Sequence, residues 1–245
     1  MNKNNVITVI RVTLGLALWY ISVLILRMYI DNLYLISMVL PYTIGLGLFM
    51  LPCIGMPATS LKAEPTVKPT AFFMLKAFVV QTGLSLPLMM VINIILTLLK
   101  VDKGGLSADE LLGNPVFYAV LLLIFNPIME EVLFRKLIMD RLSVLGVKGM
   151  IIVSSALFAV PHLFSQGPAQ VPFTFAMGLV LAYVTWKTGK LWPAMVLHAL
   201  SNLYFGFTPV LLNMVHPALT VLFVLFTLGL MVPLTVVILT HKKRA

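Results

Sequence analysis

The stretch "VFYAVLLLIFNPIMEEVLFRKL", residues 116–137, contains two features that conflict within a membrane helix. Its first ten residues are all apolar, which predicts a helix buried in a bilayer. Two adjacent glutamates, Glu130 and Glu131, then follow, and Arg135 comes four residues after the second. Because ionisable groups at membrane depth cost several kcal/mol, each of them is a candidate for a functional site.

The composition extends the membrane interpretation to the whole chain. Of the 245 residues, 60% are hydrophobic and 10% are charged, and the mean hydropathy is +1.05. A soluble domain of this size needs far more polar surface. The apolar runs are continuous, which predicts helices rather than the alternating strands of a membrane barrel. We therefore expect an all-α, polytopic integral membrane helical bundle, with residues 1–245 forming a single integral membrane domain.

The apolar runs predict about eight transmembrane helices. Residues 54–76 carry three prolines and three lysines, which indicates an exposed connection. Ser107 and Glu110 have the spacing of a capping box at the start of a short surface helix. The predicted spans are 12–30, 33–53, 77–99, 115–139, 150–164, 168–186, 191–207 and 217–240.

The basic residues predict the orientation in the membrane. If the N-terminus lies in the cytoplasm, every Lys and Arg except Arg27, Lys100 and Lys103 falls on the cytoplasmic side. We therefore expect both termini to be cytoplasmic. The basic run 242–244 directly follows a span, which is typical of contact with anionic lipid head groups. The expected partner is the lipid bilayer, and the positive net charge does not indicate nucleic acid.

Helical geometry gives the two glutamates different surroundings. Glu131 and Arg135 are four residues apart with the acid first, which is the favourable order for an ion pair. Glu130 points about 100° away around the helix and has no cation in its own segment. Since burial disfavours an unpaired charge, we expect Glu130 to act as a base near neutral pH and Glu131 to be structural. Pro127 can open this helix to water.

Two histidines also lie inside predicted spans. His162 ends the sequence "FAVPH", and "HALSN" places His198 and Asn202 on one helix face. At about 1.5 Å of rise per residue, the depths of these groups overlap with that of Glu130. We therefore expect one cavity open to the cytoplasm, with His162 at its floor.

Other interpretations of the same residues stay open at this point. Glu130, Glu131 and Arg135 can form an ion-pair cluster that locks helices together, and a buried histidine or asparagine can simply link two helices. A transporter can use such acids as a proton relay, although the sequence has no visible inverted repeat. A non-catalytic membrane binding or immunity protein can carry the same motifs.

Taken together, the motifs resemble the CPBP family of CAAX proteases and bacteriocin-processing proteins, also called the Abi family. "EEVLFR" matches the EExxxR motif, "FAVPH" matches FxxxH, and "HALSN" matches HxxxN. The resemblance covers residues 110–210 as a catalytic core. It implies an intramembrane endopeptidase of the bacterial cell membrane that cleaves a membrane-associated peptide or protein substrate. The cleavage would serve CAAX-type or bacteriocin-related processing or self-immunity.

The resemblance also implies roles for the motif residues. The first glutamate would activate water with the help of the first histidine, while the second glutamate and the arginine would orient the site. The last histidine and the asparagine would form an oxyanion hole. Zinc is possible but not required by the sequence, and Glu130, His162 and His198 would then be its ligands. The implied catalytic residues are Glu130, Glu131, Arg135, His162, His198 and Asn202.

Overall fold

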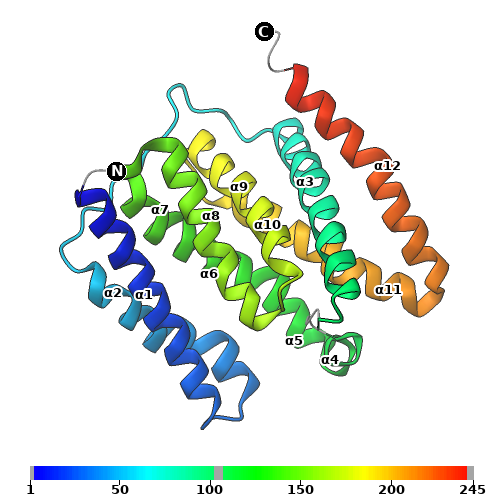
Figure 1. Cartoon of the computed structure of the whole chain (residues 1–245), viewed down its shortest axis with the longest axis horizontal. Helices are drawn as coiled ribbons and strands as arrows, with labels where there is room; N and C mark the ends of the chain where they lie inside the picture. Colours follow the sequence, from blue (N-terminus) through cyan, green and yellow to red (C-terminus); the bar gives the residue numbers. More distant parts are fainter. Residues whose placement is uncertain (1–2, 102–106, 242–245) are drawn as a thin grey trace.

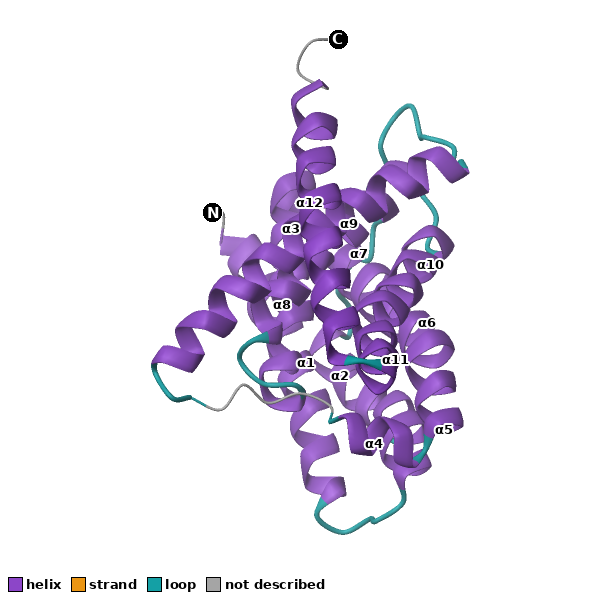
Figure 2. Cartoon of the chain, turned by 90° about the vertical axis from the view of Figure 1, so that its right-hand side faces the viewer, coloured by secondary structure: helices purple, strands orange, loops and turns teal. Residues whose placement is uncertain are grey.

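The computed structural model describes residues 3–101 and 107–241, and all the regular secondary structure within these ranges is helical. The prediction of an all-α membrane bundle is therefore confirmed. Lys103 and the basic run 242–244, which entered the orientation argument, lie outside the described residues. Both termini lie at one end of the bundle, and α4 lies at the other (Figures 1 and 2).

The first half of the chain contains the elements α1 (Lys3–Arg27), η1 (Leu35–Val39), η2 (Pro41–Gly45), α2 (Leu46–Cys53), α3 (Ala71–Leu98), α4 (Ala108–Gly113), α5 (Pro115–Val120) and η3 (Leu121–Phe125). The second half contains α6 (Asn126–Glu131), η4 (Val132–Ile138), α7 (Met139–Arg141), η5 (Leu142–Leu145), α8 (Gly146–Ser165), α9 (Gln170–Thr188), α10 (Trp192–Ser201), η6 (Asn202–Phe207), α11 (Thr208–Val215) and α12 (Pro217–His241). The η elements are π-helical except η5, which is a 3₁₀ turn.

The expected number of eight membrane spans is not confirmed, although each predicted range is helical. Two predicted ranges, 115–139 and 150–164, fall within one long stretch that reverses at Gly146, where φ is +71°. Within the described residues, six stretches are long and apolar enough to cross a membrane: Lys3–Arg27, Leu35–Cys53, Ala71–Leu98, Pro115–Ser165, Trp192–Val215 and Pro217–His241.

Helix α9 is not among these six stretches, and its position in the bundle explains why. It packs against α3, α8 and α10, and more than half of its residues are buried. A helix that is covered by protein on most sides does not need the uniformly apolar surface of a helix that faces lipid. The sequence-based prediction of a span at 168–186 therefore located the helix correctly without establishing that it crosses a bilayer.

The first two apolar stretches form a hairpin, as predicted. The Arg11 side chain donates hydrogen bonds from Nε to Pro52 O and from Nη2 to Ile54 O, both at 2.6 Å. These bonds satisfy carbonyl groups at the end of α2, which have no partner within the helix. The Trp19 indole N–H donates to Pro41 O at 2.7 Å, so the hairpin is linked along its length.

The connection between the hairpin and α3 is shorter than the sequence predicted, because α3 begins at Ala71. It is also anchored to α9 by two backbone hydrogen bonds. The Ala63 N–H donates to Trp186 O at 3.1 Å, and the Val67 N–H donates to Lys187 O at 2.9 Å. Both acceptors lie in the last turn of α9, whose end is closed by Gly189 in the left-handed conformation. A segment far away in the sequence thus caps the end of α9.

The capping box predicted for α4 is present. The Ser107 N–H donates to Glu110 Oε2 at 2.9 Å, and the Glu110 N–H donates to Ser107 Oγ at 3.1 Å. The hydrogen bonds from the Ser107 backbone and hydroxyl lower the pKa of the exposed Glu110 carboxyl below its ordinary value. This short helix lies outside the apolar stretches and closes one end of the bundle (Figure 1).

Helix α12 packs along α3 at the edge of the bundle (Figure 1). The Thr235 hydroxyl donates to Val79 O at 2.9 Å, so the two helices share a hydrogen bond that is buried from lipid. A Cβ atom at Gly83 would lie 2.7 Å from Met231 O, which is closer than van der Waals contact allows. Glycine at this position is therefore required by the close approach of two backbones.

We predict that Gly83→Val lowers the free energy of unfolding by about 1–3 kcal/mol, because the added methyl groups push α12 away from α3. Thermal unfolding of the purified protein in detergent measures this loss. Gly229→Val is the matched control, since no atom lies within 4 Å of a Cβ built at that glycine of α12. Equal losses in the two variants would contradict the packing argument.

Candidate active site

A cavity of about 590 Å³ contains two of the residues that the motifs single out. Glu130 and His162 line it, and it extends to Arg27, Asp31 and Glu110. The end of α1, which carries Arg27, and helix α4, which carries Glu110, lie at the end of the bundle opposite to both termini (Figures 1 and 2). The expected cavity, open to the end that carries the termini, was therefore wrong. His162 lies in the last turn of α8, and the residues that follow it, Ser165 and Gln166, also line the cavity.

Glu131 is bonded through both of its carboxylate oxygens. Oε2 accepts from Arg135 Nε at 3.0 Å, as the spacing predicted, and Oε1 accepts from His198 Nδ1 at 3.0 Å. Both Glu131 and Arg135 have fully buried side chains. The pairing with Arg135 is confirmed, whereas the sequence gave no indication that His198 would share the same carboxylate.

Glu130 has one carboxylate oxygen that remains unbonded. Its Oε2 lies 3.8 Å from His198 Nε2, and it has no hydrogen-bond partner within residues 3–101 and 107–241. The same side chain lines the cavity. The neighbouring glutamates therefore differ in their bonding: Glu131 is held by two partners, and Glu130 Oε2 has none among the described residues.

The ring of His162 has a fixed orientation. Its Nδ1 lies 2.9 Å from Phe158 O, one turn earlier in α8. A carbonyl oxygen only accepts hydrogen bonds, so Nδ1 carries the hydrogen and Nε2 carries the lone pair of the neutral ring. Because His162 lines the cavity, this arrangement provides a hydrogen-bond acceptor in the space that Glu130 also borders.

Phe158 is the packing centre of the site. It is fully buried, and its ring centroid lies 5.1 Å from that of His162 and 5.7 Å from that of His198. The Arg135 guanidinium carbon lies 4.9 Å from the Phe158 centroid, a cation–π contact. Phe134 packs on the same ring edge-to-face at 5.0 Å. The prediction of site residues omitted Phe158, although it is the first residue of the FxxxH motif.

The Asn202 side chain bonds to the backbone carbonyl of Leu122, which has no hydrogen-bond donor available within the helix that contains Leu122. The Asn202 Nδ2 atom donates to Leu122 O at 2.7 Å. In the π-helical stretch before the glutamates, the Asn126 N–H bonds to Leu121 O. The next donor that could reach Leu122 O would be residue 127, which is a proline and has no N–H. Pro127 thus creates the need for a side-chain donor, and Asn202 supplies it across two helices.

The arrangement of the three candidate zinc ligands can be compared with the arrangement that a metal ion requires. Glu130, His162 and His198 were the three candidates, and these ranges contain no group of three such side chains arranged to hold a metal ion. These side chains therefore do not fit a three-ligand zinc site in the arrangement that they have here.

Glu130 thus lies near His198, with 3.8 Å between Oε2 and Nε2, and it borders the same cavity as His162. Residues 112–204 match the family model described as "Type II CAAX prenyl endopeptidase Rce1-like". This segment, which includes all six motif residues, belongs to the CPBP/CAAX protease family, and the predicted resemblance is confirmed. No curated protein and no solved structure matches the chain. The family supports intramembrane endopeptidase activity.

We predict that Glu131→Gln destabilises the protein by about 3–5 kcal/mol, because it leaves the buried Arg135 cation without a counter-charge. Thermal unfolding in detergent measures the effect. Glu130→Gln is the matched control, since it removes the adjacent carboxylate, and we expect it to unfold close to wild type. A small and equal change in both variants would show that the Glu131–Arg135 pair does not support the fold.

We also predict that Asn202→Ala costs about 1–3 kcal/mol of stability, because Leu122 O then loses its hydrogen bond. Adding Pro127→Ala should remove much of this loss, since residue 127 regains an N–H. A double-mutant cycle based on thermal unfolding measures the coupling. If the two losses are simply additive, Pro127 is not the reason that Leu122 O needs Asn202.

Proposed function

We propose that the chain is an intramembrane endopeptidase in which the Glu130 carboxylate activates a water molecule. The observation that carries this proposal is that Glu130 lines the cavity while its buried Oε2 has no hydrogen-bond partner among the described residues and lies 3.8 Å from His198 Nε2. Glu131 is the only other acid of the EExxxR motif, and both of its oxygens are occupied. Glu130 is therefore the carboxylate with the capacity to take a proton.

In the proposed reaction, Glu130 accepts a proton from water while the water oxygen attacks the carbonyl carbon of the substrate peptide bond. The proton then passes to the leaving nitrogen as the carbon–nitrogen bond breaks. The lone pair on His162 Nε2 accepts a hydrogen bond from the second O–H of the same water, and that hydrogen stays on the attacking oxygen. The bond from His162 Nδ1 to Phe158 O fixes the direction of that lone pair.

Two further residues are proposed to stabilise the oxyanion. In its protonated form, His198 donates Nδ1–H to Glu131 and presents Nε2–H on the side of Glu130. Asn202 uses one amide hydrogen on Leu122 O and keeps a second. Donors that are held in place before the reaction stabilise a developing negative charge most effectively. Glu131 and Arg135 would serve this role indirectly, by holding the His198 ring.

The position of the cavity suggests the side from which substrate enters. The cavity reaches the end of the bundle away from the termini, and the basic residues predict that the termini are cytoplasmic. We therefore propose that the substrate is a membrane-associated peptide whose scissile bond enters from the outer face of a bacterial cell membrane. Processing or immunity directed at a secreted peptide fits this geometry better than cleavage of a cytoplasmic prenylated C-terminus.

We predict that Glu130→Gln reduces peptide cleavage by about 10²–10⁴-fold, because the neutral amide cannot take a proton from water. The protein should still insert and accumulate, since Glu130 Oε2 has no partner to lose within the described ranges. Mass spectrometry of peptides released from membranes of cells expressing either form, at equal protein levels, measures the difference.

The control for this experiment is Glu64→Gln, which removes an exposed acid outside both the cavity and the motifs. It should give the same peptide profile as wild type. Identical profiles from wild type and Glu130→Gln would overturn the proposal and leave a non-catalytic binding protein as the better interpretation.

A further inference from the structure

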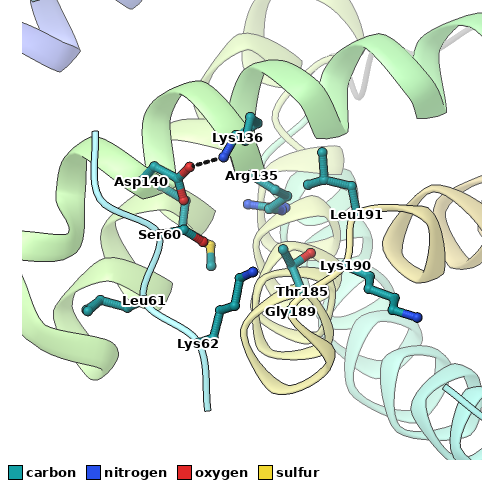
Figure 3. A pocket seen from close by; sticks show the side chains of 11 residues that line it. Ser60, Leu61, Lys62, Arg135, Lys136, Asp140, Thr185, Gly189, Lys190 and Leu191 are labelled. Atoms are coloured by element: carbon teal, nitrogen blue, oxygen red, sulfur yellow. Dashed lines mark hydrogen bonds and ion pairs between the residues drawn. The ribbon is translucent and has the colours of Figure 1, made fainter. Parts of the chain in front are cut away.

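A second cavity, of about 200 Å³, is bordered by Arg135 and shares no lining residue with the proposed catalytic cavity. Figure 3 shows that it is bordered by the connection that carries Lys62, by the helix that carries Arg135 and Asp140, and by the end of α9 with Thr185. The proposed mechanism uses none of this space. The end of α9 borders this cavity. In Figure 1 that end of α9 lies at the same end of the bundle as the start of α1 and both termini.

The Arg135 guanidinium faces this cavity with most of its hydrogen-bonding capacity unused. Its Nε donates to Glu131 and its carbon packs over Phe158. Within the part of the chain that the structure describes, neither Nη1 nor Nη2 has a hydrogen-bond partner, although Arg135 is only 1% exposed. Leaving the N–H groups of a buried cation unbonded is costly, so this arrangement points to an anionic ligand.

Two other groups point to the same kind of ligand. Thr185 is buried, and its hydroxyl likewise lacks a hydrogen-bond partner among the described residues. The ammonium group of Lys62 is directed toward the space between Thr185 and Arg135 (Figure 3). The Lys62 stem lies against Gly189, and the next residue, Ala63, is hydrogen-bonded to α9, so the side chain starts from an anchored backbone.

The charge of the lining favours an anion. Lys62, Arg135, Lys136 and Lys190 are cationic, whereas Asp140 is the single acid among the residues that border this cavity. Asp140 is itself occupied, because its Oδ2 accepts from Lys136 Nζ at 2.8 Å. Arg135 is paired with Glu131, so the cations left on the lining after both pairs are set aside are Lys62 and Lys190.

We propose that this cavity binds a phosphate group, held by the two terminal nitrogens of Arg135, the Thr185 hydroxyl and the Lys62 ammonium. Its volume is below the range of about 300–1,000 Å³ that is typical of sites for larger organic ligands, so a single tetrahedral anion fits the space. Inorganic phosphate and the phosphate of an anionic lipid head group share this chemistry. A basic cavity between membrane helices is a recognised way to bind lipid head groups.

This site would be coupled to the proposed catalytic centre through one side chain. The guanidinium that contacts the phosphate with its terminal nitrogens also holds Glu131 through Nε, and Glu131 holds His198. A ligand in the cavity would thus restrict Arg135 and, through it, the orientation of His198. Binding itself does not depend on catalysis, so the phosphate site can be tested even if the proposed protease function is wrong.

Two titrations of the full-length protein test the proposal, with thermal unfolding as the readout. In the first, the protein in neutral detergent is titrated with inorganic phosphate against chloride at equal ionic strength. In the second, it is placed in phosphatidylcholine nanodiscs with increasing fractions of phosphatidylglycerol. We expect a saturable rise in the unfolding temperature in at least one series. A rise with phosphate identifies the free anion as a ligand, and a rise with phosphatidylglycerol alone identifies the lipid.

The variants Lys62→Gln and Thr185→Val should each weaken the effective ligand about tenfold, which corresponds to the loss of one charge-assisted hydrogen bond. Lys148→Gln is the matched control, because it removes an exposed cation that does not border the cavity. Its titration should follow that of wild type. Absence of a rise in both series, or an equal response in all three variants, would overturn the proposal.

Discussion

The buried carboxylate of Glu131 is the interaction on which the rest of the site depends. It accepts from Arg135 on its own helix and from His198 on α10, so one side chain joins two helices and neutralises a cation within the bundle. In an apolar surrounding, a charge without such partners would cost more than the fold can tolerate. Because Glu131 takes on this structural task, Glu130 is left with an oxygen free for chemistry. Phe158 then packs against the partners of Glu131 and orients His162 through its carbonyl group.

Departures from regular α-helical geometry are a second feature of the site. The helix that carries the two glutamates changes from α to π geometry before and after them, at η3 and η4. Such departures from the regular helix often occur at functional sites. Pro127 removes one backbone donor, and Asn202 replaces it from α10 and η6. Pro127 and Asn202 are thus parts of one arrangement, although Pro127 precedes the EExxxR motif and Asn202 ends the HxxxN motif.

Much of this could be predicted from the sequence, for identifiable reasons. Apolar runs located the helices, although α1 begins nine residues and α3 six residues earlier than predicted. The four-residue spacing gave the Glu131–Arg135 pair, because such pairs depend on local periodicity. The link between Glu131 and His198 could not be predicted, since it depends on how α10 crosses the helix of the glutamates. The prediction of the end at which the cavity opens was wrong for a related reason. Depths counted along single helices do not show how those helices are arranged around the cavity. The position of helix α9 was predicted correctly. Because α9 is buried among other helices, hydropathy alone could not show whether it crosses the membrane. The catalytic roles of the motif residues remain proposals.

The contact between the early connection and the end of α9 has a consequence for the way the chain assembles. The N–H groups of Ala63 and Val67 bond to carbonyls of Trp186 and Lys187, which are synthesised long after them. Until then, these N–H groups can hydrogen-bond to water, because the connection runs outside the apolar stretches. The α1–α2 hairpin, whose contacts are local, can form first during synthesis. Closure of the connection over α9 is then a late step, and it also positions Lys62 beside Gly189 and Thr185. Biogenesis would therefore complete the basic cavity only after α9 has been synthesised.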